Sequence, residues 1–387
     1  MASKVGTQLI HADDNHDQPY VAPPISVSTT FKLPQNLPFS AVDEAEGKYH
    51  IYSRYTQDVI FRVEKVLGAL HGEGCHAITF SSGLSSVFVA LLHLAPRRIA
   101  ITKGYFGVHE TIKLVQKASR GTVEVIGLDD EYQPGDICWL ETPVNPTGEA
   151  RDIEYYAQKV HKVGGKLVVD STFGPPLVQN PFEFGADIVM HSGTKYFGGH
   201  SDLLSGVLVV KTLKEWKELW HIRTYVGNVM GSLDAWLLLR SMRSFHVRIP
   251  RQSATAASLV QWLAELAQVP KGKSFDGCSG GVVHSVLHAS LQQEAFVKRQ
   301  LPERFPATFA ILLADEKLAG VFPHLLKVFT AATSLGGVES LIEQRGKADG
   351  VTDMRLLRLS VGLEELEDLK QDLRQAINSV SQRAGKL

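Results

Sequence analysis

Short apolar runs alternate with amphipathic stretches between about residues 57 and 210, and this alternation restricts the fold more than any other feature. The expected strands are rich in β-branched and other apolar residues and lie at 97–102, 122–128, 136–141, 166–172, 186–192 and 205–210. The expected helices lie at 57–72, 85–95 and 152–165. Strands that are apolar throughout are buried on both faces, so the pattern predicts an α/β fold with a largely parallel sheet between helices. Ligands of such sheets bind at the carboxyl ends of the strands.

The pattern changes after about residue 231. A long helical stretch comes first and continues to residue 268; it is followed by strand candidates at 281–289, 307–314 and 354–362 and by a charged amphipathic helix at 364–380. This order predicts a smaller α+β domain. We place the boundary near residue 240, so that residues 51–240 form a large domain and 241–387 a small C-terminal domain.

The first fifty residues are expected to form an extended arm without helices. Prolines interrupt this stretch at positions 19, 23, 24, 34 and 38, and proline disrupts a helix interior. Because an arm of this kind must pack on something, we expect residues 1–50 to contact a neighbouring subunit.

The composition excludes several classes of partner. With 40 Lys and Arg against 41 Asp and Glu, the formal net charge is -1, so no nucleic-acid partner is indicated. No apolar stretch is long enough to span a bilayer, and no secretory pattern follows the single lysine near the start. The three cysteines are widely spaced and suggest no disulfide framework. We expect a cytoplasmic protein that has no membrane partner.

One lysine stands in an unusual setting. Lys195 lies between small hydroxyl residues and glycines in the segment HSGTKYFGGHSD, directly after a strand candidate. An amine that is shielded from water favours its neutral form and can attack an aldehyde. A pyridoxal-5′-phosphate (PLP) enzyme needs such an amine to carry its cofactor as a Schiff base. By itself the segment does not decide, because most lysines face solvent.

Two further segments agree with a PLP site. Asp170 ends the apolar strand candidate 166–172, where an unpaired carboxylate would be costly. Against a pyridine nitrogen, a carboxylate there would keep the ring protonated. Ser81–Leu84 opens a helix, and a helix N-terminus suits a phosphate. The simpler interpretations, a turn residue for Asp170 and a plain helix cap for Ser82, stay open at this point.

The motifs together resemble the γ-family of PLP enzymes of cysteine and methionine metabolism. They occur in order along nearly the whole chain: YSRY at 52, SSGL at 81, GYFG at 104, ETPVNP at 141, VVDSTF at 168, HSGTKYFGGHSD at 191, SLGGVESLI at 334 and RLSVGLE at 358. The family includes cystathionine γ-synthase, cystathionine γ- and β-lyases, methionine γ-lyase and O-acetylhomoserine sulfhydrylase. The resemblance implies PLP as cofactor, fold type I of the PLP-dependent transferases (aspartate aminotransferase-like), and a homotetramer built from catalytic dimers.

The resemblance also implies roles for individual residues. Lys195 would form the Schiff base and shuttle protons, Asp170 would pair with the pyridine nitrogen, and Tyr105 would stack on the ring. The other implied cofactor-binding residues are Ser82, Gly83, Leu84, Thr172, Ser192 and Thr194, together with Tyr52 and Arg54, which would reach the phosphate of the neighbouring subunit. No metal is expected, because no carboxylates or cysteines surround the two histidines of the lysine segment at ligand spacing.

The substrate-binding residues implied by the resemblance include two departures from the family pattern. Asn145 and Arg358 would bind the substrate α-carboxylate, with Ser334 nearby. Cystathionine enzymes commonly carry an arginine where this chain has Glu110, and often a glutamate where it has Thr333. The usual His-Pro after VESLI is also replaced, by the residues Glu-Gln-Arg.

These departures favour a substrate with an uncharged leaving group, such as O-acetyl-L-homoserine. The expected reaction is γ-replacement or γ-elimination through a vinylglycine-type ketimine. The alternative is a β- or γ-lyase that releases ammonia and a keto acid from cystathionine, homocysteine or methionine. Transamination is less consistent with the motifs, and a non-catalytic relative would have little reason to keep the complete residue set.

Overall fold

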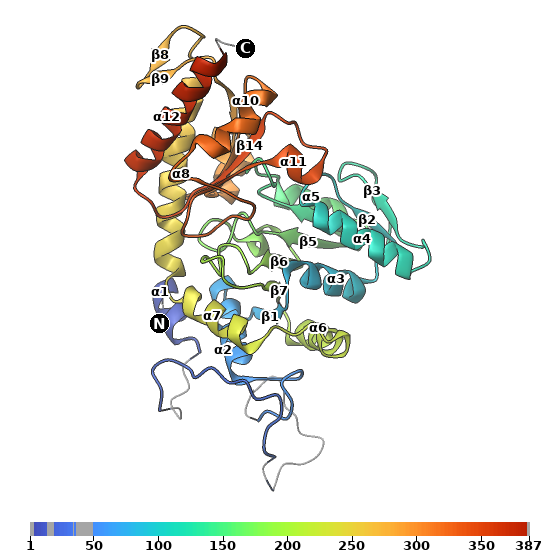
Figure 1. The fold of residues 1–387 in the computed structure, drawn as a ribbon. Helices are drawn as coiled ribbons and strands as arrows, with labels where there is room; N and C mark the ends of the chain where they lie inside the picture. Colours follow the sequence, from blue (N-terminus) through green and yellow to red (C-terminus); the bar gives the residue numbers. More distant parts are fainter. Residues whose placement is uncertain (1–3, 14–18, 34, 36–48, 385–387) are drawn as a thin grey trace.

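A seven-stranded sheet forms the larger part of the molecule in the computed structural model, which describes residues 4–13, 19–33, 35 and 49–384 (Figure 1). The strand order is β1-β7-β6-β5-β4-β2-β3. Neighbouring strands from β3 to β6 are parallel, and β7 is antiparallel to both β1 and β6. The strands are β1 (His76–Phe80), β2 (Arg98–Ala100), β3 (Glu124–Ile126), β4 (Asp136–Glu141), β5 (Lys166–Asp170), β6 (Ile188–Ser192) and β7 (Gly206–Val210).

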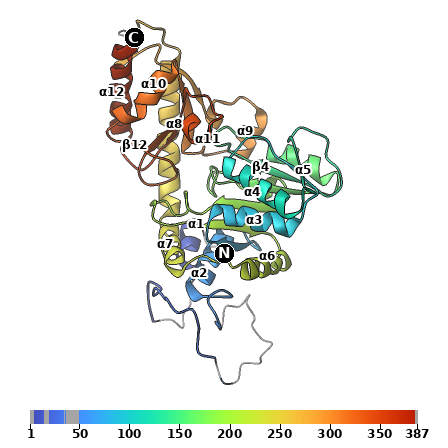
Figure 2. The ribbon, with the colours of Figure 1, turned by 45° about the vertical axis from the view of Figure 1, so that its right-hand side comes forward.

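Helices cover both faces of this sheet (Figure 2). One face carries α3 (Gly83–Leu94), α4 (Phe106–Ala118) and α6 (Leu213–Val226). The other face carries α2 (Asp58–His71), α5 (Ile153–His161) and α7 (Ser232–Met242). Because successive strand residues point to opposite faces, Trp139 enters the first core and Leu140 the second. The fold class expected from the alternating pattern is thus confirmed.

A second sheet lies beside the first and has the order β10-β11-β14-β13-β12. Its pairs are antiparallel except β12 with β13. Its strands are β10 (Val283–Leu287), β11 (Thr308–Leu313), β12 (Thr330–Ala331), β13 (Leu341–Gln344) and β14 (Leu356–Ser360). The smaller elements are α9 (Ala295–Gln300), α10 (Glu316–Val321), α11 (Arg345–Asp349), the β8–β9 hairpin (Ser274–Phe275 with Cys278–Ser279) and 3₁₀ turns at Pro181–Phe184, Ala289–Leu291 and Phe322–Leu325.

Two long helices belong to this second part. In Figure 1, α8 (Phe245–Ala267) runs from the vicinity of α1 and α7 up to α12 (Leu366–Ala384). The helical stretch expected as one continuous segment is therefore interrupted between α7 and α8, at residues 243–244. The domain boundary near residue 240 falls within α7 and stays a prediction.

The N-terminal arm departs from the expectation at its start. A short helix, α1 (Val5–His11), lies where we expected no helix, and its Leu9 is fully buried between α2 and α8. The prolines that disfavour a helix begin only at residue 19, after α1 has ended. Further along, the Pro23 carbonyl accepts a hydrogen bond from Trp236 Nε1 at 2.8 Å. Of the five prolines, the last two, at 34 and 38, lie outside the described residues.

Candidate active site

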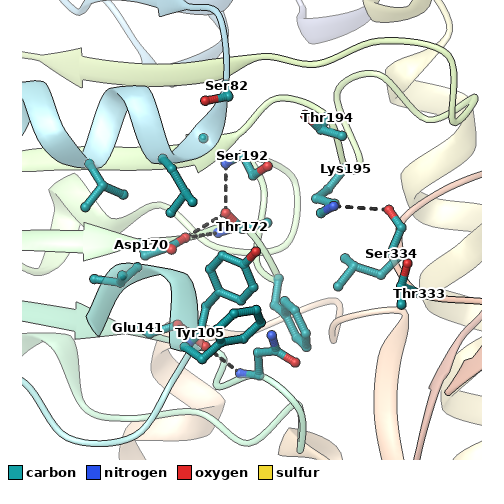
Figure 3. A pocket seen from close by; sticks show the side chains of 18 of the residues that line it. Ser82, Tyr105, Glu141, Asp170, Thr172, Ser192, Thr194, Lys195, Thr333 and Ser334 are labelled. Atoms are coloured by element: carbon teal, nitrogen blue, oxygen red, sulfur yellow. Dashed lines mark hydrogen bonds between the residues drawn. The ribbon is translucent and has the colours of Figure 1, made fainter. Parts of the chain in front are cut away.

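A cavity of about 560 Å³ lies where the carboxyl ends of the large-sheet strands face the loops of the second sheet (Figure 3). Strands β4, β5 and β6 end at Glu141, Asp170 and Ser192, and all three residues line the cavity. From the second sheet come the loop with Thr333 and Ser334, the 343–348 segment and Arg358. The site therefore lies at the strand ends, as expected for a parallel sheet.

Lys195 follows β6 in a tight turn and projects into the cavity (Figure 3). Its Nζ donates a hydrogen bond to Ser334 Oγ at 3.1 Å. Burial, followed by the positive charge of Arg358, lowers the pKa of the Lys195 amine to about 8, against the opposing effect of Glu343. A larger share of the amine is therefore neutral near pH 8 than in an exposed lysine. This is the state that can attack an aldehyde.

Asp170 ends β5 and is buried beside Glu141 in the adjacent strand. Its Oδ1 accepts hydrogen bonds from the backbone N–H of Thr172 at 3.0 Å and from the Thr172 hydroxyl at 2.6 Å. Burial raises the pKa of Asp170 despite these two bonds. Within the described part of the chain Asp170 makes no ion pair, so its second oxygen is available to a donor inside the cavity.

The N-terminus of α3 forms another wall. Ser82 caps this helix by accepting a hydrogen bond from the Ser85 N–H at 3.1 Å, and its first turn contains no acidic residue. Gly83 packs so closely on Ser192 that an added Cβ would lie 3.1 Å from the Ser192 hydroxyl. Leu84 and Thr194 line the same region. The free N–H groups and hydroxyls gathered here suit a phosphate.

Tyr105 is placed by Glu141. The Tyr105 N–H donates to Glu141 Oε2 at 2.7 Å, and the Asn145 N–H donates to Glu141 Oε1 at 2.7 Å. Gly104 has φ 92°, and an added Cβ there would lie 2.6 Å from the same carboxylate, so only glycine fits. Burial, followed by the charge of Asp170, raises the pKa of Glu141. One buried carboxyl group thus orients both Tyr105 and Asn145.

Arg358 is a buried cation on the opposite wall. It donates to Asn145 Oδ1 at 3.0 Å, to the Ser334 carbonyl at 2.8 Å and to Glu343 Oε2 at 2.5 Å. Ser334 adopts φ 78°, an uncommon value outside glycine, and this places its hydroxyl on Lys195 and its carbonyl on Arg358. Burial lowers the pKa of Arg358 to about 10.

The structure adds residues that the sequence interpretation did not assign to the site. Glu343 and Arg345 both line the cavity, as do Phe106, Phe173 and Met190. The two charged residues were noted only as replacements for a usual His-Pro. Two opposite charges directly after the apolar residues 341–342 were the available signal, since buried charges are normally paired.

Three predicted site residues lie elsewhere in this chain. Tyr52 and Arg54 do not line the cavity, and Arg54 donates instead to the Thr224 carbonyl of α6 at 3.1 Å. Glu110 also lies outside the cavity: its side chain is 61% exposed and forms an ion pair with Lys113 at 2.7 Å. Glu110 does not line the cavity of its own chain because its side chain turns to solvent one helical turn beyond Phe106, and its assignment to the substrate stays a prediction.

These residues fit pyridoxal phosphate. Asp170 offers a buried carboxylate without a cation for a pyridine N–H, α3 offers a phosphate site without an acidic residue, and Lys195 offers an amine of lowered pKa. A mostly parallel sheet that carries such a lysine just after a central strand defines a PLP-dependent enzyme of fold type I. The family model described as Cys/Met metabolism PLP-dependent enzyme matches residues 6–378, and the chain belongs to this family.

Individual relatives match over almost the full length. Human cystathionine gamma-lyase is 33% identical and covers 98% of this chain and 95% of its own. A Bacillus subtilis cystathionine gamma-synthase/O-acetylhomoserine (thiol)-lyase is 31% identical and covers 99% of both chains. Among solved structures, metB from Corynebacterium glutamicum superposes with a TM-score of 0.85 at 29% identity and covers 98% of each chain.

Two further features were searched for: a membrane-spanning helix and a metal site. Among the described residues, no helix combines the length and apolar character that crossing a membrane requires. The same residues contain no group of three or more His, Cys, Asp or Glu side chains arranged to hold a metal ion.

Proposed function

We propose that this protein catalyses γ-replacement on a small amino acid with an uncharged leaving group, such as O-acetyl-L-homoserine. The observation that carries the proposal is the charge balance of the cavity. Among the described residues that line it, the cations other than Lys195 are Arg358, which is paired with Glu343, and Arg345, which is paired with Glu343 and Asp349. This part of the lining therefore offers no uncompensated cation to a second carboxylate at the far end of a substrate.

Part of the cavity lining is apolar. Thr333 stands in the lining with the apolar residues Leu84, Phe106, Val108, Leu335 and Ala348. An acyl ester loses little hydration free energy when it packs against such a surface. A charged end group would lose its hydration there without gaining an oppositely charged partner. This supports an ester-type leaving group over the second zwitterionic end of cystathionine.

The residues of the chain have distinct proposed tasks. The bound cofactor would supply an electron sink for charge that develops at Cα. Asp170 would hold a proton on the pyridine nitrogen, and Lys195, as a free amine, would take a proton from Cα and return one on the γ side. Arg358 and Asn145 would bind the α-carboxylate, and Tyr105 would accept a proton from the incoming amine. Ser82, Gly83, Leu84, Ser192 and Thr194 would hold the phosphate, with Thr172 supporting Asp170.

A lyase acting on cystathionine or methionine is the second candidate. Among the relatives are enzymes named cystathionine gamma-lyase and cystathionine beta-lyase as well as a synthase, so family membership does not separate elimination from replacement. A lyase would release ammonia and a 2-keto acid without any added nucleophile.

The test is product identification by mass spectrometry. O-Acetyl-L-homoserine is supplied with and without a thiol or amino-thiol nucleophile, and L-cystathionine and L-methionine are supplied alone. We expect a thioether product and acetate from the first pair, with ammonia release well below product formation. Faster turnover of cystathionine than of the acyl ester would contradict the proposal.

We also propose that two chains share each site within a homotetramer. Tyr52 and Arg54 lie outside their own chain's cavity, and Val21 and Val27 of the arm are 93% and 86% exposed. A neighbouring chain would cover these apolar residues and bring its Arg54 to the phosphate. The cytoplasmic location stays a prediction.

A further inference from the structure

Glu343 forms an ion pair with Arg358, the residue that the proposed function assigns to the substrate α-carboxylate. We propose that Glu343 is an internal carboxylate that competes with the α-carboxylate of the amino acid for Arg358, and that Arg345 receives Glu343 when the amino acid binds. This inference rests on the proposed function, since it takes Arg358 as the carboxylate-binding residue. In addition, the competition by Glu343 would set the affinity of Arg358 for the α-carboxylate.

Sheet register brings the two residues together. Strands β13 and β14 are antiparallel neighbours, and Glu343 lies directly opposite Arg358. Directly opposed residues on one face of a sheet are in contact range. The Glu343 side chain is 8% exposed and that of Arg358 is 4% exposed, so the ion pair is almost fully removed from water.

A bound α-carboxylate would meet the Glu343 carboxylate at close range. Arg358 already donates to three acceptors: Asn145, Ser334 and Glu343. Two carboxylates that share one buried arginine repel each other strongly, because little water screens them. Asn145 and the Ser334 carbonyl are neutral and can remain in place, whereas Glu343 is the acceptor whose charge opposes the ligand. Glu343 therefore has to leave Arg358 when the ligand arrives.

Arg345 is placed to receive it. Its Nη1 lies 3.4 Å from Glu343 Oε1, at the outer limit of a hydrogen bond. The Nε of Arg345 is held by Asp349 at 3.1 Å, and its guanidinium stands 5.5 Å from the centre of the Phe106 ring. Arg345 is thus held in the cavity wall with its Nη1 directed to Glu343. A small rotation of the Glu343 side chain would break its ion pair with Arg358 and bring it into a closer ion pair with Arg345.

The exchange has a consequence for ligand selection. Only a ligand with a carboxylate can replace the negative charge that Arg358 loses when Glu343 moves away. A ligand that has the amino group but lacks the carboxylate leaves Glu343 on Arg358 and gains nothing from the exchange. Glu343 consequently lowers the affinity for every simple amino acid and disfavours retention of weakly bound ones.

The test is a double-mutant cycle on the PLP-loaded protein. Binding of L-norvaline, which has no side-chain leaving group, is measured by titration calorimetry in wild type, Glu343→Gln, Arg345→Gln and the double variant. We expect Glu343→Gln to lower the Kd about tenfold or more, and Arg345→Gln to raise it about tenfold. In the Glu343→Gln background, Arg345→Gln should change the Kd by less than about twofold, because no charge then needs a second partner.

L-Norvalinamide is the matched control ligand, because it keeps the amine and lacks the carboxylate. Its Kd should be the same within about twofold in all four proteins. Arg355→Gln is the matched control protein, since Arg355 forms an exposed ion pair with Asp353 at the start of β14 and does not line the cavity. Thermal melting and the visible cofactor band show whether each variant is folded and loaded.

Three results are decisive in different ways. Norvaline binding that Glu343→Gln leaves unchanged or weakens overturns the competition, while the proposed function stands. An equal effect of Arg345→Gln in both backgrounds overturns the role of Arg345, because a merely structural residue would act in this way. Norvaline that binds no better than its amide to any of the four proteins overturns the assignment of Arg358 and with it the proposed function.

Discussion

Lys195 shows how burial prepares a residue for chemistry. An exposed lysine has a pKa of 10.5, and burial lowers that of Lys195 to about 8. Between these two pH values the unfolded chain binds more protons at this position than the folded protein. The contribution of Lys195 to the free energy of unfolding therefore increases as the pH rises from about 8 to 10.5. Below pH 8 the buried ammonium is a cost to stability.

The lowered pKa predicts selective reactivity of Lys195. In protein freed of cofactor, the rate of acetylation by acetic anhydride should reach half its maximum near pH 8 at Lys195, because only the neutral amine reacts. Quantitative mass spectrometry of the modified peptides measures the profile. Lys113, an exposed residue of α4, supplies the reference peptide that shows the reagent is active at each pH. A Lys195 profile that reaches half its maximum only near pH 10.5, the ordinary lysine value, would contradict the interpretation.

Substitution of Asp170 should lower the rate of catalysis. Asp170→Asn keeps the shape but removes the carboxylate that would hold a proton on the pyridine nitrogen, so kcat should fall about a hundredfold or more. Steady-state kinetics on cofactor-saturated protein measure the change. Asp187→Asn is the matched control, because Asp187 lies at the opposite end of β6 and is bonded to His161 and Lys166. Equal losses in the two variants would show a structural effect only.

Elements from both faces of the large sheet meet at its β1 edge through one ion pair. Glu64 of α2 accepts from the Arg223 guanidinium of α6 at 2.5 Å and from the N–H and hydroxyl of Thr79 in β1. Arg223 also donates to the Thr79 carbonyl at 3.0 Å. All three side chains are buried. The pair thus joins helices that lie on opposite faces of the sheet.

Breaking this pair should destabilise the protein. Arg223→Met leaves the Glu64 carboxylate buried without its cation and should lower the free energy of unfolding by about 3 kcal/mol. Urea denaturation followed by circular dichroism measures the shift. The control is Arg251→Met, which removes an exposed pair with Glu365 and should cost less than about 0.5 kcal/mol. Similar shifts in both variants would contradict the role given to burial.

At the scale of the whole molecule, the position of Arg54 predicts complementation between chains. Arg54→Ala and Lys195→Ala should each be nearly inactive as homo-oligomers. Co-expressed with two different tags and purified through both, they should recover up to about half of the wild-type activity, because one site per mixed dimer then has both native residues. The lack of any recovery would show that each chain completes its own site.

Much of the architecture follows from local patterns, and the exceptions have local causes. The apolar strands β4 to β7 and helix α3 were predictable because burial on both faces and a Ser-Gly helix start leave clear signals. Strand β1 and helices α4 and α6 were not identified. In strand β1, Thr79 interrupts the apolar run, and Trp216 and Leu219 are buried in α6 among many charged residues. Their packing on the sheet, rather than their sequence, sets their boundaries.

The candidate site divides in the same way. The cofactor chemistry could be inferred from the sequence alone, because eight motifs of the family occur in order along the chain and include Lys195 and Asp170. Which charges share the cavity depends on the tertiary structure. Glu343 and Arg358 are fifteen residues apart, and antiparallel pairing of β13 with β14 makes them direct neighbours. Glu110 turns instead to Lys113 and solvent. Electrostatic effects depend on distance and burial, and both are properties of the folded chain.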